Sequence, residues 1–176
     1  LRLAHEGAQM SAVPALFPTG EEDYAGMTEH ENNCNAVVQE YVAYFENLRP
    51  TSLAELDRYF AADVRFKDPF NDVIGCDAVR HIFEHMFTHT ETPRFIVAGW
   101  MCEDKMSSIR WQFQCRMQGM AISVPGMSFV RFDDQGKAVE HIDYWDPAVG
   151  IYEQLPLLGT LMRYLRRRLS AAEVGK

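Results

Sequence analysis

Asp68 is the carboxylate whose position most suggests chemistry. Val64, Phe66 and Asp68 occupy alternate positions, so a strand would place this acid on an otherwise apolar face. A carboxylate on such a face must be hydrogen-bonded or paired. Asp68 is therefore either a working group or, because Pro69 follows it, the first residue of a turn.

A second group of candidates lies near the end of the apolar sequence. His141, Asp143 and Trp145 alternate, so all three share one face of a predicted strand. If that face lines a cavity, His141 or Asp143 supplies an acid or a base. If Ile142 and Tyr144 are the buried residues instead, the three are surface or interface side chains.

Three histidines, His81, His85 and His89, recur every four residues along a predicted helix. Histidines at this spacing can hold a metal from one helix face. The residue after His81 is Ile82, where a zincin would carry a glutamate. We therefore expect a solvated or partly packed helix flank, with no metal and no other cofactor.

The elements that must position these groups follow from the spacing of apolar residues. Spacings of three and four predict helices over 33–48 and 52–60, the second opened by a Ser52–Glu55 capping box, and a third from Gly75 to about Thr90. Period-two alternation predicts five strands, over 64–68, 94–102, 106–117, 121–132 and 138–145. Helices followed by hairpin-linked strands indicate an α+β domain with helices on one face of a curved, mostly antiparallel sheet.

Composition limits the classes of protein that fit. We expect a flexible segment over 1–30, one domain over 31–150 and a basic amphipathic helix over 151–176. A net charge of −8 argues against a nucleic-acid surface. The four cysteines are widely spaced and no apolar run is long enough to span a bilayer, which favours reduced thiols in the cytoplasm.

The C-terminal helix ends in Arg163, Arg166, Arg167 and Arg168. Arginines suit a helix C-terminus, so a solvated face is one interpretation. The same strip could cover a pocket mouth or make peripheral contact with an anionic membrane.

Several strings within about 34–146 resemble the ketosteroid isomerase and SnoaL-like polyketide cyclase group of the nuclear transport factor 2-like superfamily. The stretch 36–43 is similar to the first helix of the steroid isomerases, with Tyr41 at the position of the oxyanion donor. The stretch 60–63 followed by Asp68-Pro69 is similar to the segment that carries the general base, and 129–137 resembles the hairpin of the penultimate strand.

The resemblance implies a cone-shaped, cystatin-like α+β barrel with an apolar pocket. It also implies proton transfer next to a carbonyl, with Asp68 as base and Tyr41 as donor, in an isomerase or a cyclase-like lyase. Ser128 stands where the isomerases carry a second donor, a protonated acid. The alternative is a binding module that holds a small hydrophobic ligand without converting it.

The predicted ligand-binding side chains are mostly aromatic: Phe66, Phe70, Trp100, Trp111, Phe113, Ser128 and Trp145, with Met127 and Phe129 as further candidates. On the strand 106–117, Arg110, Gln112, Gln114 and Arg116 alternate with apolar residues and form a flat polar surface. Relatives pair through such a surface, so the resemblance implies a homodimer.

Overall fold

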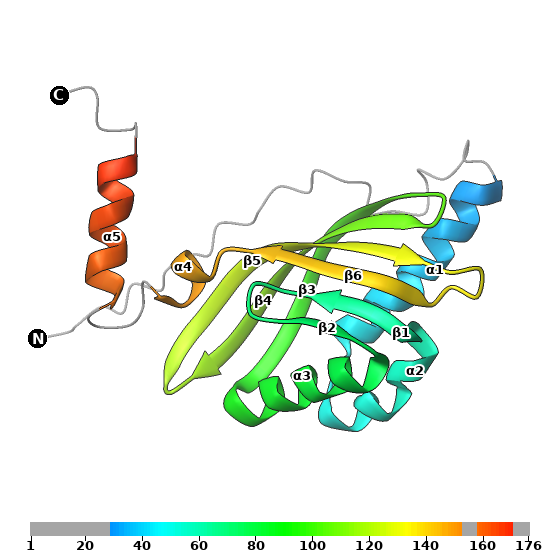
Figure 1. The fold of residues 1–176 in the computed structure, drawn as a ribbon, viewed down its shortest axis with the longest axis horizontal. Coiled ribbons are helices and arrows are strands. Elements are labelled where there is room, and N and C mark those ends of the chain that lie inside the picture. The colour runs from blue at the N-terminus through cyan, green and yellow to red at the C-terminus, as the bar shows by residue number, and fades with distance from the viewer. Residues whose placement is uncertain (1–28, 153–157, 171–176) are drawn as a thin grey trace, which may run out of the picture.

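A computed structural model of the chain describes residues 29–152 and 158–170 (Figure 1). One six-stranded sheet, in the order β2-β1-β6-β5-β4-β3, curves around the helices α1 and α3. The helices are α1 (Glu29–Glu46), the 3-10 helix η2 (Pro50–Glu55), α2 (Leu56–Tyr59), α3 (Cys76–His89), α4 (Pro147–Gly150) and α5 (Leu158–Leu169). The strands are β1 (Phe60–Lys67), β2 (Asp72–Ile74), β3 (Glu91–Glu103), β4 (Met106–Met117), β5 (Met120–Phe132) and β6 (Ala138–Trp145).

The sheet is mixed, because β1 and β6 run parallel while every other neighbouring pair is antiparallel. Two-residue turns join β3 to β4 and β4 to β5. Gln118 and Gly119 of the second turn both have positive φ, at 51° and 80°. This conformation matches the twist of the strands that it joins. The predicted α+β class with a curved, mostly antiparallel sheet is confirmed.

The core lies between the inner face of the sheet and the two long helices. Alternation on β4 buries Ile109 and Trp111 and leaves Arg116 exposed, as its sequence predicts. The largest fully buried side chains come from α1, α2, β1, α3 and β5: Tyr41, Phe60, Phe66, Leu56, Val38, Val64, Val79 and Val130. Tyr41 therefore points into the core from α1, as its spacing predicts.

The second predicted helix is wrong in detail. Residues 50–59 form a 3-10 turn followed by a single α-helical turn. Ser52 does not cap a helix with Glu55. Its hydroxyl instead accepts from the backbone N–H of Arg49 at 3.0 Å and donates to the Arg49 carbonyl at 2.9 Å. Pro50 starts the turn and leaves the serine inside it.

Two further differences concern short segments. The predicted turn 71–75 contains the three-residue strand β2, which pairs with β1. Of the predicted C-terminal helix over 151–176, the structure describes α5, and residues 153–157 and 171–176 lie outside the described part. Of the predicted flexible segment over 1–30, residues 29 and 30 belong to α1 and residues 1–28 lie outside the described part. All four cysteines are free, and burial raises the pKa of the Cys34, Cys76 and Cys115 thiols. None of the helices in the two described stretches has the length and apolar character needed to span a bilayer.

Gly126 of β5 lies opposite Trp111 of β4, and a Cβ there would overlap the indole ring. Because Trp111 is buried, its ring cannot move aside at low cost. We expect Gly126→Ala to lower the free energy of unfolding by about 1–3 kcal/mol. Urea denaturation measures this, with Ala121→Ser at an exposed position of the same strand as control; equal unfolding midpoints would contradict the packing described.

Candidate active site

Two neighbouring cavities open between the inner face of the sheet and the helices. The smaller, of about 30 Å³, reaches Tyr41 and His141. The larger, of about 280 Å³, reaches Asp68 and the exposed Phe70. Both are lined by Asp143, together with Phe83, Phe95 and Trp111. Asp143 therefore lies where a buried polar centre meets a space of ligand size.

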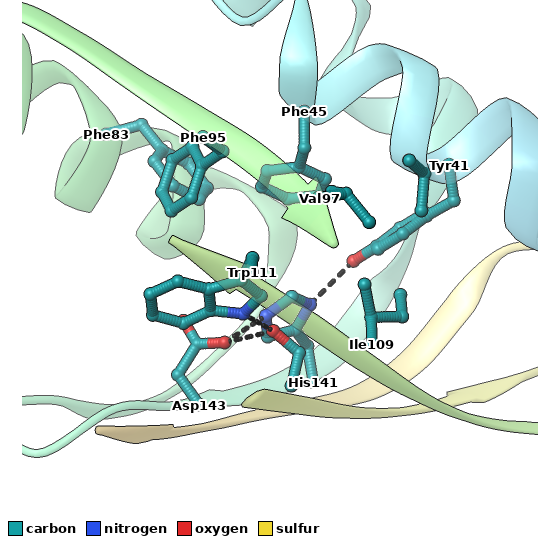
Figure 2. A pocket seen from close by; sticks show the side chains of 11 residues that line it. Tyr41, Phe45, Phe83, Phe95, Val97, Ile109, Trp111, His141 and Asp143 are labelled. Atoms are coloured by element: carbon teal, nitrogen blue, oxygen red, sulfur yellow. Dashed lines mark hydrogen bonds and ion pairs between the residues drawn. The ribbon is translucent and has the colours of Figure 1, made fainter. Parts of the chain in front are cut away.

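The buried polar centre begins with a contact between helix α1 and strand β6. The hydroxyl of Tyr41 lies 2.7 Å from Nδ1 of His141, and Nε2 of His141 lies 2.8 Å from Oδ1 of Asp143 (Figure 2). Strand alternation puts His141 and Asp143, which are two residues apart, on the same inner face. Of the two sequence-based alternatives for this face, the structure shows the cavity-lining one.

Ser128 and Trp111 complete the hydrogen-bonded set. The Ser128 hydroxyl donates to Oδ1 of Asp143 at 2.5 Å, and the Trp111 indole N–H donates to the Ser128 oxygen at 2.7 Å. These residues stand on β5 and β4, beside β6 in the sheet. We call Tyr41, His141, Asp143, Ser128 and Trp111 the polar chain.

The direction of each hydrogen bond in the polar chain follows from the groups at its ends. The indole of Trp111 can only donate. Burial, and then the nearby Asp143 carboxylate, raise the pKa of Tyr41 well above its ordinary value, so the phenol keeps its proton. Among the described residues the buried O–H has no acceptor other than His141 Nδ1, and Nε2 faces the Asp143 carboxylate, so a neutral imidazole accepts from Tyr41. His141 then carries its proton on Nε2 and donates to Asp143. Both branches thus end on one carboxylate oxygen.

Aromatic side chains fix the imidazole in this orientation. The ring of His141, which is 3% exposed, stacks on Phe66 at 5.0 Å between centroids and touches Phe45 and Phe60. The Asp143 side chain is 14% exposed. Its second oxygen, Oδ2, has no hydrogen-bond partner among residues 29–152 and 158–170, whereas Oδ1 has two.

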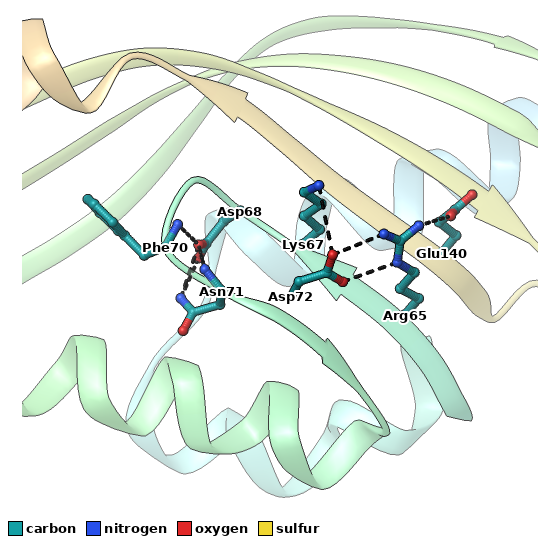
Figure 3. A network of polar contacts seen from close by, with 7 residues as sticks. All are labelled: Arg65, Lys67, Asp68, Phe70, Asn71, Asp72 and Glu140. Atoms are coloured by element: carbon teal, nitrogen blue, oxygen red, sulfur yellow. Dashed lines mark hydrogen bonds and ion pairs between the residues drawn. The ribbon is translucent and has the colours of Figure 1, made fainter.

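Asp68 has a different environment. Its Oδ1 accepts from the backbone N–H groups of Phe70 and Asn71, both at 2.7 Å, and the Asn71 side-chain amide bonds both carboxylate oxygens (Figure 3). This is the geometry of an acid that closes a turn. Asp68 also lines the larger cavity, so the turn holds a carboxylate at its edge.

A group of exposed charges holds that turn in place. Arg65 of β1 forms two hydrogen bonds to Asp72 of β2 and one to Glu140 of β6 (Figure 3). The Arg65 guanidinium lowers the pKa of Asp72. Because the network joins three strands, it fixes the short strand β2 and the 68–71 turn beside it.

Most predicted ligand-binding residues line the cavities. Phe66, Phe70, Phe113 and Trp145 line the larger one, Ser128 the smaller, and Trp111 both. Trp100 is a correction, since its indole donates to Asn35 of α1 at 3.0 Å and lies outside both linings. Met127 and Phe129 flank the inward Ser128 on β5 and so face outward, with Met127 46% exposed.

The three histidines of α3 serve no visible metal site. Within the described parts of the chain, no cluster of three or more His, Cys, Asp or Glu side chains could hold a metal ion. His85 and His89 stack on each other at 3.9 Å and line the larger cavity, whereas His81 is exposed beside Glu84. Sequence reasoning missed the lining role of His85 and His89, although their shared helix face was a usable signal.

Comparison with known families agrees with the fold. A model of the SnoaL-like domain matches residues 38–141, so this chain belongs to the SnoaL-like family. No match was found among curated proteins.

Solved structures with the same fold include three from bacteria. A protein with a ketosteroid isomerase-like fold from Catenulispora acidiphila, in complex with trimethylamine, has 16% identity and a TM-score of 0.57 over 67% of this chain and 90% of its own. An NTF2-like protein of unknown function from Burkholderia pseudomallei has 21% identity and a TM-score of 0.58 over 66% of this chain and 93% of its own. An LEH-like epoxide hydrolase from M. tuberculosis has 11% identity and a TM-score of 0.57 over 79% of this chain and 97% of its own. At these identities the likeness establishes the predicted nuclear transport factor 2-like fold.

Tyr41→Phe tests the buried end of the polar chain. The change leaves Nδ1 of the buried His141 without its donor, so we expect the free energy of unfolding at neutral pH to fall by about 1–3 kcal/mol. Urea denaturation measures the loss. Tyr59→Phe is the matched control, because the Tyr59 hydroxyl makes no hydrogen bond to any residue in the described stretches and its ring stacks on Tyr44.

The difference in the free energy of unfolding between wild type and Tyr41→Phe should decrease above pH 10. The folded-state pKa of Tyr41 is raised, so the unfolded chain loses this proton first, and the wild type loses stability by about 1.4 kcal/mol per pH unit from Tyr41 alone. The variant has no phenol at this position, so it does not lose stability in this way. A difference in the free energy of unfolding that stays constant with pH would contradict a protonated, buried Tyr41.

Proposed function

We propose that this protein is an acid–base enzyme for a small, neutral, apolar carbonyl compound, with Asp143 as the general base. One observation carries the proposal. Asp143 lines the ligand-sized cavity, its Oδ1 is held by two hydrogen bonds, and its Oδ2 has no partner in the described part of the chain. A carboxylate held on one oxygen and open on the other is oriented to take a proton.

The proposed step is proton abstraction next to a carbonyl. Asp143 takes a proton from the carbon beside the carbonyl group, and the C–H electron pair forms the C=C bond of an enolate. The carbonyl oxygen takes the negative charge, and the carboxylic acid so formed returns its proton to carbon. His141 and Ser128 act as positioning residues, because they hold the Asp143 carboxylate.

The cavity lining supports a neutral apolar substrate. Aromatic and aliphatic side chains form most of the wall, and among the described residues no lysine or arginine belongs to it. Carboxylates stand at two places in the lining, on Asp68 and Asp143, which disfavours an anionic ligand. A volume of about 280 Å³ lies just below the range of about 300–1,000 Å³ for small-molecule sites, which fits a molecule of one or two rings.

The geometry supports Asp143 over Asp68 as the base. The hydrogen bonds of the 68–71 turn occupy both oxygens of Asp68. Tyr41 does not line the larger cavity with Asp68, and its hydroxyl proton is donated to His141. Ser128 likewise gives its hydroxyl proton to Asp143. Neither hydroxyl is therefore free to stabilise a ligand oxyanion as the family resemblance implies.

A second candidate function is binding without conversion. The observation in its favour is that hydrogen bonds within the protein already engage Tyr41 and Ser128, the two expected oxyanion donors. Such a module would hold the same apolar ligand in the larger cavity. It would not depend on the charge of Asp143.

Asp143→Asn distinguishes the two functions. We expect kcat/KM for hydrogen exchange at the acidic carbon of 2-tetralone in deuterium oxide, followed by proton NMR, to fall by about 100- to 10,000-fold. Binding of 2-tetralone, measured by quenching of tryptophan fluorescence, should persist, because the aromatic walls remain.

Asp68→Asn is the matched control, since it removes a carboxylate from the same cavity. It should retain most of the exchange activity. Equal exchange rates for wild type and Asp143→Asn would overturn the assignment of the base. Binding without exchange in wild type would favour the binding module.

A further inference from the structure

Helix α5 separates its apolar and basic residues to a degree that the enzyme site does not explain. At about 100° per residue, its leucine and methionine side chains fall within an arc of about 100°. These residues are Leu158, Leu161, Met162, Leu165 and Leu169. The polar side carries Arg163 and Arg167, and Arg166 and Arg168 lie along the two edges of the arc.

The apolar arc is not buried. Leu161 is 53% exposed, Leu165 43% and Leu169 86%. Figure 1 draws α5 apart from the sheet and from α1 and α3. Burying such an arc is the usual reason for an amphipathic helix to be stable. The exposed leucines therefore indicate that another surface covers them.

Charge identifies the kind of occupant. Helix α5 carries four arginines and no acidic residue. Removing these four from the 17 basic side chains of the sequence leaves 13 against 25 acidic ones, a formal charge of −12 outside the helix. An anionic surface would attract α5 and repel most of the remaining chain, which would turn the helix toward it.

Two self-associating α5 helices fit these residues less well. Arginines line both edges of the apolar arc, and α5 offers no acid to pair with them across a helix–helix contact. At a bilayer surface the same arrangement is favourable, because arginine side chains at the edges reach the phosphate level while the leucines enter the acyl region.

We propose that α5 binds flat on the surface of an anionic lipid bilayer. Twelve residues give a helix of about 18 Å, which suits a helix lying on the surface. The family match ends at residue 141, so α5 lies outside it, and no residue of α5 belongs to the lining of either cavity described above.

Vesicle sedimentation of the full chain tests this. Wild type should sediment with vesicles of phosphatidylcholine and phosphatidylserine in about a two-to-one ratio, and far less with phosphatidylcholine alone. Replacing the four α5 arginines with glutamine should weaken binding by several hundred-fold, at about fivefold per arginine. Added salt should weaken wild-type binding in the same direction.

Two further variants separate the contributions. Leu161→Asp with Leu165→Asp should abolish binding with every arginine in place. The matched control changes Arg58, Arg94, Lys105 and Arg116 to glutamine, which removes four exposed positive charges outside α5, and it should still sediment.

Three outcomes would overturn the proposal. They are sedimentation that does not depend on phosphatidylserine, equal binding by the arginine variant, and an oligomer that the leucine variant dissociates without any wild-type binding to vesicles. The last would assign the apolar arc to a second copy of the chain. Circular dichroism of each variant, which should show the wild-type spectrum of the sheet domain, verifies that the folded domain is intact.

Discussion

The imidazole of His141 is buried among aromatic rings, and a buried imidazole needs partners for both of its nitrogens. Tyr41 supplies one partner from α1 and Asp143 supplies the other from β6. Through Ser128 and Trp111 the same set of hydrogen bonds extends to β5 and β4. These hydrogen bonds thus fix the position of α1 relative to β4, β5 and β6. The side chains that form them also line the smaller cavity between these elements.

The two carboxylates of the cavity have separate tasks for the same physical reason. Asp68 is held by backbone N–H groups of its own turn, which is anchored by the exposed network around Arg65. Asp143 is held by side chains from other strands and keeps one oxygen open. An acid that shapes a cavity edge and an acid that can take a proton are therefore distinguished by which groups bind them.

Local patterns predicted most of the fold. Alternation on 106–117 and 138–145 gave those strands their observed bounds, because one face of each is buried. The strand β2 was missed, since three residues carry no readable period and are held by pairing with β1 and by Arg65. Ser52 was misassigned because the capping-box pattern considers only the serine and the glutamate. It does not take into account Pro50, which starts the 3-10 turn two residues earlier.

The site was harder to predict for a different reason. Alternation correctly put His141 and Asp143 on one face, and the resemblance selected Tyr41. The contact between Tyr41 and His141 joins residues 100 positions apart, and no local spacing encodes it. Trp100 was misplaced because aromatic character does not distinguish a side chain beneath α1 from one at the cavity, farther along the same sheet.

The tautomer of His141 tests the account most directly. Nitrogen-15 NMR of the histidine side chains at neutral pH should show a neutral ring with its proton on Nε2, protected from solvent exchange, and Nδ1 as the acceptor. Tyr41→Phe should change the Nδ1 shift. A proton on Nδ1 with none on Nε2 in the wild type would reverse the direction of the polar chain and contradict the assignment of Asp143 as the carboxylate that it orients.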